Sequence, residues 1–325
     1  MDTMKKLARV GAVIVLSVLA LSETLSLAHT WPQRVVKVMV PLGAGSGADV
    51  TARLLADLLS KRWGQAVVVE NRPGADGIVG LTAFLTGTDD HVLLFTPTGT
   101  FTSHPFLHDK LSYDQHELVP IARVTSTLVS ITVPASLNLD SLADLVALVR
   151  SQPGKLHWAS VTGATDLIFS GFLKGAKLRM VRVPYRDTVQ AINDLGEGRI
   201  QVFLSALATV RPHVASGRVK MLAVTNRERA PVAPQVPTVT EAGYPALQFD
   251  GLVGLFAPPG MPVESRERIA ADVRAVVLDP AIATRVAATG QIVTPGTPAE
   301  FSASIDEQRA KFAAIAKAFD IKPKR

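Results

Sequence analysis

The stretch VVKVMVPLGAGSGADVTARLLADLLSKR, residues 35–62, determines how the rest of the sequence is interpreted. Its opening residues are mostly apolar and β-branched, which predicts a buried strand. Gly43, Gly45 and Gly47 follow, and beyond them apolar residues recur at the spacing of a helical face. The stretch therefore predicts a strand, a glycine-rich loop and a helix in direct succession.

Such a loop ends at a helix N-terminus, where backbone N–H groups lack partners and the helix dipole is positive. This arrangement binds anions, and three glycines favour close approach of a ligand over a turn that only needs their flexibility. The residues we expect to bind a ligand are Gly43, Ala44, Gly45 and Ser46. Asp49 is expected to cap the helix, and it would contact a ligand that carries an amino group.

The same loop has a competing interpretation as a dinucleotide site. Gly43-x-Gly45-x-x-Ala48 matches the G-x-G-x-x-G/A fingerprint, and Glu70 stands about 20 residues further on, where a ribose-binding acid is expected. An NAD(P)-dependent oxidoreductase is therefore the alternative function. Asp49 at the helix start disfavours a pyrophosphate, and export of the chain disfavours a nicotinamide cofactor.

Export is predicted from residues 1–28, which have the three regions of a signal peptide. A basic start precedes an apolar core, Val10–Leu21, which is too short for a comfortable membrane span. Small residues then end the region at Ala28. We expect cleavage near Ala28 and a periplasmic location for the mature chain.

The composition sets limits on fold and partners. The chain has 325 residues, 47% of them hydrophobic, and no cysteine, which predicts a large core divided between two domains. Its net charge of +6 is scattered and only 6% of its residues are aromatic, so nucleic-acid binding is not expected. A mild positive field favours anionic small molecules.

Helical and strand patterns alternate along the chain, which predicts an α/β fold with largely parallel sheets. β-Branched stretches at 124–133 and 247–256 are expected to cross between two halves of the molecule. We predict one domain from residues 29–128 with 250–325 and a second from 129–249, with a ligand cleft between them.

Ligands of such sheets bind beyond the C-terminal ends of the strands. Thr98 belongs to a polar loop that follows a predicted strand of the first domain. The corresponding loop of the second domain contains Thr162, Gly163, Ala164 and Thr165, and a predicted helix follows it. Two helix N-termini at one cleft suit a carboxylate better than a cation.

Five motifs in order carry a family resemblance: WPQRVVKVMVPLGAGSGAD, VVVENRPGADG, LHWASVTGATD, VPYRD and VPTVTEAGYPAL. Together they resemble the Bug-type solute-binding receptors of tripartite tricarboxylate transporters, over nearly all of the mature chain. The resemblance implies a periplasmic binding protein of type II-like fold, with two α/β domains. Such a receptor closes around a carboxylated metabolite and delivers it to a membrane permease.

The resemblance also implies that main-chain amides of both loops bind the carboxylate, with help from hydroxyl groups. By position it adds Tyr185 of the VPY motif and Ser205 to the candidate ligand-binding residues. The sequence departs from the family pattern at Leu42, where an aromatic residue is usual, and at Ser46 and Asp187, where glycine is usual. These departures concern the part of the site that selects the ligand.

Catalytic chemistry is not indicated. Ser46 lacks the G-x-S-x-G order of a nucleophile elbow. His104 and His108 have a spacing that suits a metal on a helix, but Pro105 interrupts it, and we expect two surface histidines. We therefore predict a monomeric receptor that is not an enzyme and holds no metal or cofactor. Its expected partners are a small carboxylate and the permease subunits of a tripartite transporter.

Overall fold

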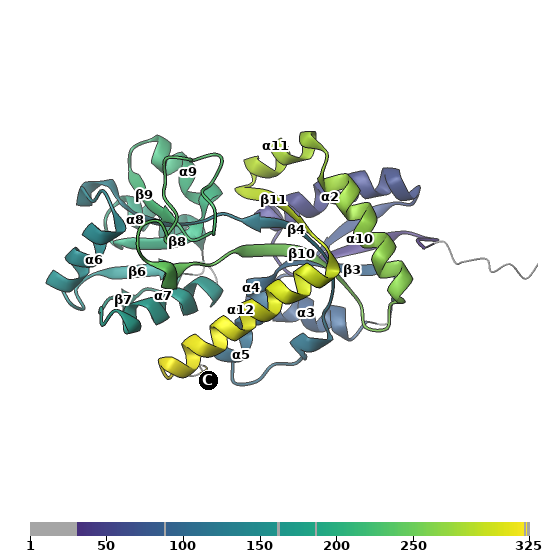
Figure 1. The fold of residues 1–325 in the computed structure, drawn as a ribbon, viewed down its shortest axis with the longest axis horizontal. Helices are drawn as coiled ribbons and strands as arrows, with labels where there is room; N and C mark the ends of the chain where they lie inside the picture. The colour runs from purple at the N-terminus through teal and green to yellow at the C-terminus, as the bar shows by residue number, and fades with distance from the viewer. Residues whose placement is uncertain (1–30, 88, 161–162, 186, 322, 324–325) are drawn as a thin grey trace, which may run out of the picture.

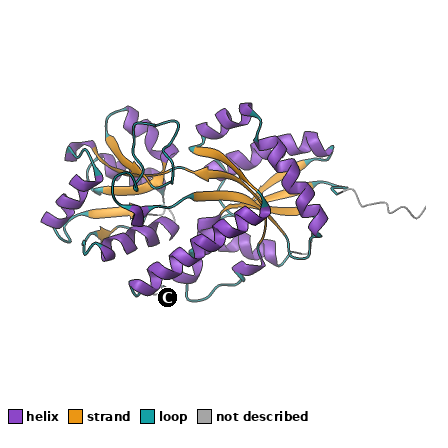
Figure 2. Cartoon of the chain, viewed as in Figure 1, coloured by secondary structure: helices purple, strands orange, loops and turns teal. Residues whose placement is uncertain are grey.

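The computed structural model describes residues 31–87, 89–160, 163–185, 187–321 and 323. The predicted signal peptide, residues 1–28, lies outside the described residues, and so does Thr162. The described chain forms two α/β lobes, each built on one sheet (Figures 1 and 2). Within these ranges, no helix is long and apolar enough to cross a membrane.

The first lobe is built on a six-stranded sheet with the order β11-β4-β10-β3-β1-β2. The strands are β1 (Val36–Val40), β2 (Val67–Asn71), β3 (Val92–Pro97), β4 (Val119–Thr127), β10 (Gly251–Ala257) and β11 (Gln291–Gly296). The helices of this lobe are α2 (Gly47–Trp63), α3 (Ile78–Leu85), α4 (Thr98–Thr102), α5 (His104–Leu107), α10 (Val263–Val277) and α11 (Pro280–Ala288), with the 3-10 turn η1 (Ala75–Gly77).

Both faces of this sheet are largely buried, which explains why β1 is apolar at every position except Lys37, which is exposed. Val38 and Val40 contribute to a core with residues of α2 and α10. Met39, which points to the other face, joins a core with residues of α3. A parallel strand covered on both sides carries apolar residues along most of its length rather than at alternate positions.

The second lobe is built on a five-stranded sheet with the order β7-β6-β8-β5-β9. Its strands are β5 (Val129–Pro134), β6 (His157–Ser160), β7 (Val181–Arg182), β8 (Val202–Ala206) and β9 (Val219–Val224). Its helices are α6 (Leu142–Ser151), α7 (Gly163–Gly175), α8 (Thr188–Gly196) and α9 (Leu207–Ala215).

The chain passes between the lobes twice, and the two passages lie side by side in the centre of the molecule (Figure 1). On the way out, Leu128 alone separates β4 from β5, and it is fully buried. On the way back, Phe249 and Asp250 lead into β10, which pairs with β4. The strands of the two sheets therefore fall on either side of the domain limits predicted from the sequence. Those limits themselves stay a prediction.

The register of the strands shows which edges of the two sheets face each other. In the first lobe, Pro97 at the end of β3 pairs with Val253 near the start of β10, the strand that arrives from the second lobe. In the second lobe, Ala206 at the end of β8 pairs with Val129, the first residue after the crossing. The C-terminal ends of the parallel strands in both sheets therefore point toward the crossing segments.

One helix, α12 (Pro298–Ala318), belongs to both lobes and runs diagonally from one to the other in Figure 1. Thr297 and Glu300 form a capping box at its start. Phe301 lies in a core of the first lobe, and Phe312 lies in the core of the second. The apolar face that the sequence shows along this helix is therefore shared between two cores.

Candidate functional site

The loop after β1 forms the N-terminus of α2. The helix begins at Gly47, and the Ser46 side chain caps it by accepting a hydrogen bond from the Asp49 N–H at 3.2 Å. The prediction that Asp49 is the cap was therefore wrong, because Ser46 stands in the extended conformation that a cap needs. Gly45 has a φ of 82°, a conformation that favours glycine.

Asp49 instead stabilises the conformation of the loop. Its side chain is almost fully buried and accepts hydrogen bonds from the Gly45 N–H at 2.8 Å and from Asn71 Nδ2 at 2.9 Å. Arg53 lies 3.0 Å from the same carboxylate. Burial raises the pKa of Asp49, but the hydrogen bonds from Arg53, Gly45 and Asn71 outweigh it, so the pKa lies below its ordinary value.

This network decides which amides of the loop remain for a ligand. The Gly45 N–H is taken by Asp49, whereas helix geometry leaves the N–H groups of Gly47 and Ala48 without intrahelical partners. Gly43 and Gly45 are exposed, and a Cβ atom built on either would have no neighbour within 4 Å. The tip of the loop therefore borders open space.

Three buried hydroxyl groups lie at strand ends that point toward the crossing segments. Thr98 follows β3, Ser160 is the last residue of β6, and Ser205 is near the end of β8. Their exposed fractions are 0%, 8% and 0%, and none of the three hydroxyls has a hydrogen-bond partner within the described part of the chain. Buried hydroxyls normally find partners, so three without one mark a place that a ligand or water completes.

The sequence predicted Thr98 and Ser205 as site residues and missed Ser160. Thr98 was expected in a loop, but it begins the short helix α4. The signal for Ser160 was present, since a serine ends an apolar strand directly before the second candidate loop. Ser205 lies on the strand that forms the middle of the second sheet, between β6 and β5.

The second loop leads into α7, whose first turn packs against the first lobe. A Cβ atom built on Gly163 would lie 2.2 Å from Leu107 Cδ1 and 3.1 Å from Ser103 Oγ. One built on Gly99 would lie 2.9 Å from the Cβ of Ala164. Glycine and alanine therefore permit a close contact between the lobes here, and Ala164 and Thr165 are buried.

Tyr185 lies apart from these groups in its hydrogen bonding. Its hydroxyl donates to Asp194 Oδ2 at 2.7 Å, and its ring packs on the core beneath α8. Burial, followed by the hydrogen bond to Asp194, raises the pKa of Tyr185 to about 12. A ligand would have to compete with Asp194 for this hydroxyl.

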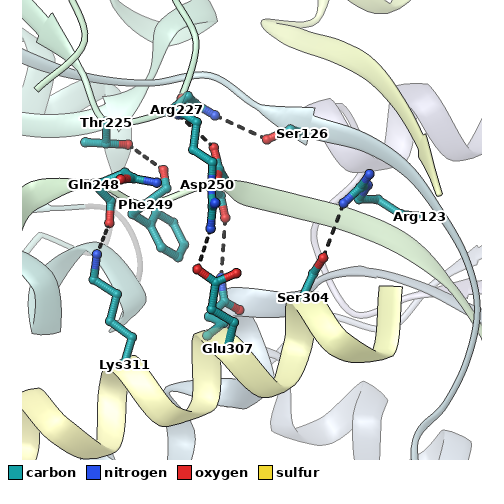
Figure 3. Close-up of polar contacts among 12 residues, drawn as sticks. Arg123, Ser126, Thr225, Arg227, Gln248, Phe249, Asp250, Ser304, Glu307 and Lys311 are labelled. Atoms are coloured by element: carbon teal, nitrogen blue, oxygen red, sulfur yellow. Dashed lines mark hydrogen bonds and ion pairs between the residues drawn. The ribbon is translucent and has the colours of Figure 1, made fainter. Parts of the chain in front are cut away.

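A cavity of about 410 Å³ lies elsewhere between the lobes, among the crossing segments, β11 and α12 (Figure 3). The sequence predicted none of the residues that line it. Its charged lining residues are Arg123, Arg227, Glu228, Asp250, Glu307 and Lys311. With three basic and three acidic groups, the cavity has no net charge that would select a carboxylate.

Arg227 connects two of the segments that line this cavity. Its Nε donates to Asp250 Oδ2 at 3.0 Å, and its Nη2 donates to Glu307 on α12. Lys311, also on α12, donates to the main-chain oxygen of Gln248 (Figure 3). Thr98, Ser160 and Ser205 do not line this cavity, although Thr294, whose buried hydroxyl also has no partner among the described residues, does. The candidate site at the facing strand ends is therefore separate from this cavity.

Comparison with known proteins now decides the family. A model described as tripartite tricarboxylate transporter family receptor matches residues 51–321. The chain belongs to this family. As a receptor of this family it is 32% identical to a UPF0065 protein of Bordetella bronchiseptica, over 94% of this chain and 91% of that protein.

Solved receptor structures support the same assignment. The periplasmic binding protein BugD is 26% identical, with a TM-score of 0.76 over 90% of this chain and 100% of that one. Rpa4515 of R. palustris, solved with adipate, gives 26% identity and a TM-score of 0.80 over 90% and 100% of the two chains. MatC of Rhodopseudomonas palustris, with bound malate, gives 27% and 0.75 over 88% and 99%.

These comparisons confirm the resemblance to Bug-type receptors and the type II-like binding-protein fold. The family consists of periplasmic binding receptors and is not an enzyme family, which removes the support for an oxidoreductase. Glu70, the acid that a dinucleotide site would use, accepts a hydrogen bond from Arg72 Nε at 2.5 Å. The individual ligand-binding residues stay predictions.

Proposed function

We propose that this protein is a non-enzymatic solute receptor that captures a small carboxylate between its lobes and delivers it to the membrane permease of a tripartite transporter. The observation that carries the proposal is the group of buried hydroxyls of Thr98, Ser160 and Ser205, which have no hydrogen-bond partner among the residues that the structure describes. They lie at the facing strand ends of both lobes, where ligands of α/β sheets bind.

The first helix terminus supplies the anion seat in this proposal. The N–H groups of Gly47 and Ala48 and the dipole of α2 bind one carboxylate, with Gly43, Ala44 and Gly45 leaving room for it. Asp49 fixes the loop, and its negative charge is offset by Arg53. The hydroxyls then complete the hydrogen bonding of the bound molecule.

We propose a dicarboxylate as the ligand class. Two helices, α2 and α7, begin on opposite lobes, so each carboxylate of one ligand can meet one helix N-terminus. The proteins solved with adipate and malate are relatives that carry dicarboxylates. Gly163, Ala164, Thr165 and Thr162 are the proposed contacts on the second lobe.

The mature receptor is proposed to begin after Ala28, to reside in the periplasm and to act as a monomer with the two predicted domains. Family members are periplasmic binding proteins, which supports the location. Mass spectrometry of periplasmic protein should find the N-terminus near residue 29. An intact Met1 in that fraction would contradict export with cleavage.

A thermal-shift screen of the mature chain tests the ligand class. We expect a dicarboxylate at 100 times its Kd to stabilise the folded state by about 2.7 kcal/mol. Matched monocarboxylates, with one of the two groups replaced by a methyl, should give a smaller shift. Stabilisation by NAD and by none of the acids would contradict the proposal.

A further inference from the structure

Three residues that play no part in the proposed carboxylate site form a cluster in the first lobe: Asp76, His104 and His108. The sequence predicted two surface histidines here, and that prediction was wrong. His104 is fully buried, and His108 is half-buried. Pro105 does not interrupt the local structure, because it stands in the first turn of α5, where proline is tolerated.

The distances in this cluster suit a shared metal ion. His104 Nε2 lies 3.6 Å from Asp76 Oδ2, and it donates a hydrogen bond to the main-chain oxygen of Asp76 at 3.1 Å, which a bound ion would replace. Ligand atoms about 2.0–2.2 Å from a tetrahedral ion lie roughly 3.3–3.6 Å from one another. One donor atom of His108 completes the set, with all three donors within 4.8 Å of one another.

The surroundings of His104 resemble the support that metal-binding histidines usually have. Tyr113 Oη lies 2.7 Å from His104 Nδ1 and fixes the orientation of the ring. The backbone also takes part, because Ala75 and Asp76 both have positive φ values, 47° and 55°. This conformation is uncommon for two consecutive residues other than glycine. With it, the main-chain oxygen and Oδ2 of Asp76 both lie close to His104 Nε2.

A second group of similar composition lacks these properties. Asp89, Asp90 and His91 also have donor atoms close together. However, Arg34 forms ion pairs with both carboxylates. Asp76, by contrast, has no ion pair with arginine or lysine among the described residues. The guanidinium of Arg34 therefore already supplies positive charge to the second group, whereas no arginine or lysine among the described residues does so for Asp76.

We propose that Asp76, His104 and His108 bind a divalent transition-metal ion of the zinc class. Two imidazoles and one carboxylate favour Zn²⁺, Co²⁺ or Ni²⁺ over Mg²⁺ or Ca²⁺, which prefer oxygen ligands alone. An ion at His104 Nε2 would require the imidazole tautomer that carries its proton on Nδ1, from which it would donate a hydrogen bond to Tyr113 Oη. The site lies against the second lobe, because a Cβ atom on Gly163 would be 3.4 Å from Asp76 Oδ2.

Co²⁺ titration of the mature, untagged chain after chelator treatment tests the site. We expect visible d–d absorption that saturates at one Co²⁺ per chain and is displaced by Zn²⁺. His108→Gln and Asp76→Asn should weaken binding at least tenfold, and Tyr113→Phe should weaken it about 10- to 100-fold. His104→Gln is avoided because its ring is fully buried and the variant could fail to fold.

Two control variants should bind Co²⁺ like the wild type: His116→Gln, at an exposed histidine, and Asp90→Asn, in the second cluster. Circular dichroism checks that every variant is folded. Absence of saturable absorption, or equal binding by His108→Gln and His116→Gln, would overturn the metal site. A protein that binds dicarboxylates but no Co²⁺ would overturn this inference and leave the proposed receptor function intact.

Discussion

The two helix N-termini at the candidate site are held in place by different parts of the molecule. The start of α2 is fixed within its own lobe by Ser46, Asp49 and Asn71, and its tip borders open space. The start of α7 instead packs against residues of the opposite lobe, Ser103 and Leu107. The proposed anion site at α2 is therefore held within one lobe, whereas the proposed anion site at α7 lies where the two lobes are in contact.

Asp49→Ala should have the largest effect, because it removes the support of the proposed anion site at α2. The Gly45 N–H and Asn71 Nδ2 would lose their acceptor, which should cost about 2–3 kcal/mol of unfolding free energy and most of the ligand affinity. Urea unfolding and calorimetry measure the two effects. Asp57→Ala, at an exposed acid of the same helix, is the control. Equal stability of the two variants would show that Asp49 does not support the loop.

Gly163→Val changes the N-terminus of α7 and should lower ligand affinity without lowering stability. Added bulk against Leu107 and Ser103 opposes contact of the lobes, at a cost of about 1–3 kcal/mol, or roughly 5- to 150-fold in affinity. The unfolding free energy of the unliganded chain should change little, if the lobes separate in the absence of ligand. Gly196→Val, where the nearest atom is 3.9 Å away, is the control. Wild-type affinity in Gly163→Val would mean that the ligand binds without this contact.

Ser205→Ala should distinguish the effect of this hydroxyl on protein stability from its effect on ligand affinity. The hydroxyl has no partner among the described residues, so its removal should leave the stability of the unliganded protein unchanged or slightly higher. The same change should lower ligand affinity by about 0.5–1.5 kcal/mol. Paired measurements of unfolding and binding check both signs. A large loss of stability would show that the hydroxyl already has a partner.

The smallest expected effect is the pH dependence of stability, and it also arises from Asp49 in the loop before α2. Because the pKa of Asp49 is below its ordinary value of 3.8, the ionised carboxylate stabilises the folded state at neutral pH. This contribution is lost as the pH falls through the folded-state pKa. The stability advantage of wild type over Asp49→Asn should therefore shrink in acid, as measured by urea unfolding at several pH values. If the difference in unfolding free energy between wild type and Asp49→Asn did not change with pH, ionisation of Asp49 would not be the cause of that difference.

The sequence was informative where local chemistry determines local structure. The glycines and the apolar periodicity predicted the strand, loop and helix around Gly45, because turn geometry and helical faces depend on neighbouring residues. Thr98 and Ser205 could be placed at strand ends for the same reason. Ser46 and Asp49 were harder to assign, since either residue type can cap a helix and only backbone geometry decides between them.

Contacts between distant segments could not be predicted. Arg227 bonds to Asp250 and Glu307, which lie 23 and 80 residues away, and a single sequence carries no signal for such pairs. The burial of His104 has the same origin, because it depends on contacts with Asp76 and Tyr113 across a loop and a turn. The cavity at the crossing segments and the histidine cluster therefore became visible only in the structure.

The order of synthesis gives α12 a consequence for export. The core of the second lobe includes Phe312, and the first sheet includes β10 and β11, which follow the whole second lobe in the chain. Neither core can be completed until the residues of α12 have left the ribosome. A chain that is predicted to cross a membrane unfolded benefits from this delay, because premature folding would block translocation. We therefore expect both lobes to stay incompletely folded until α12 has been synthesised.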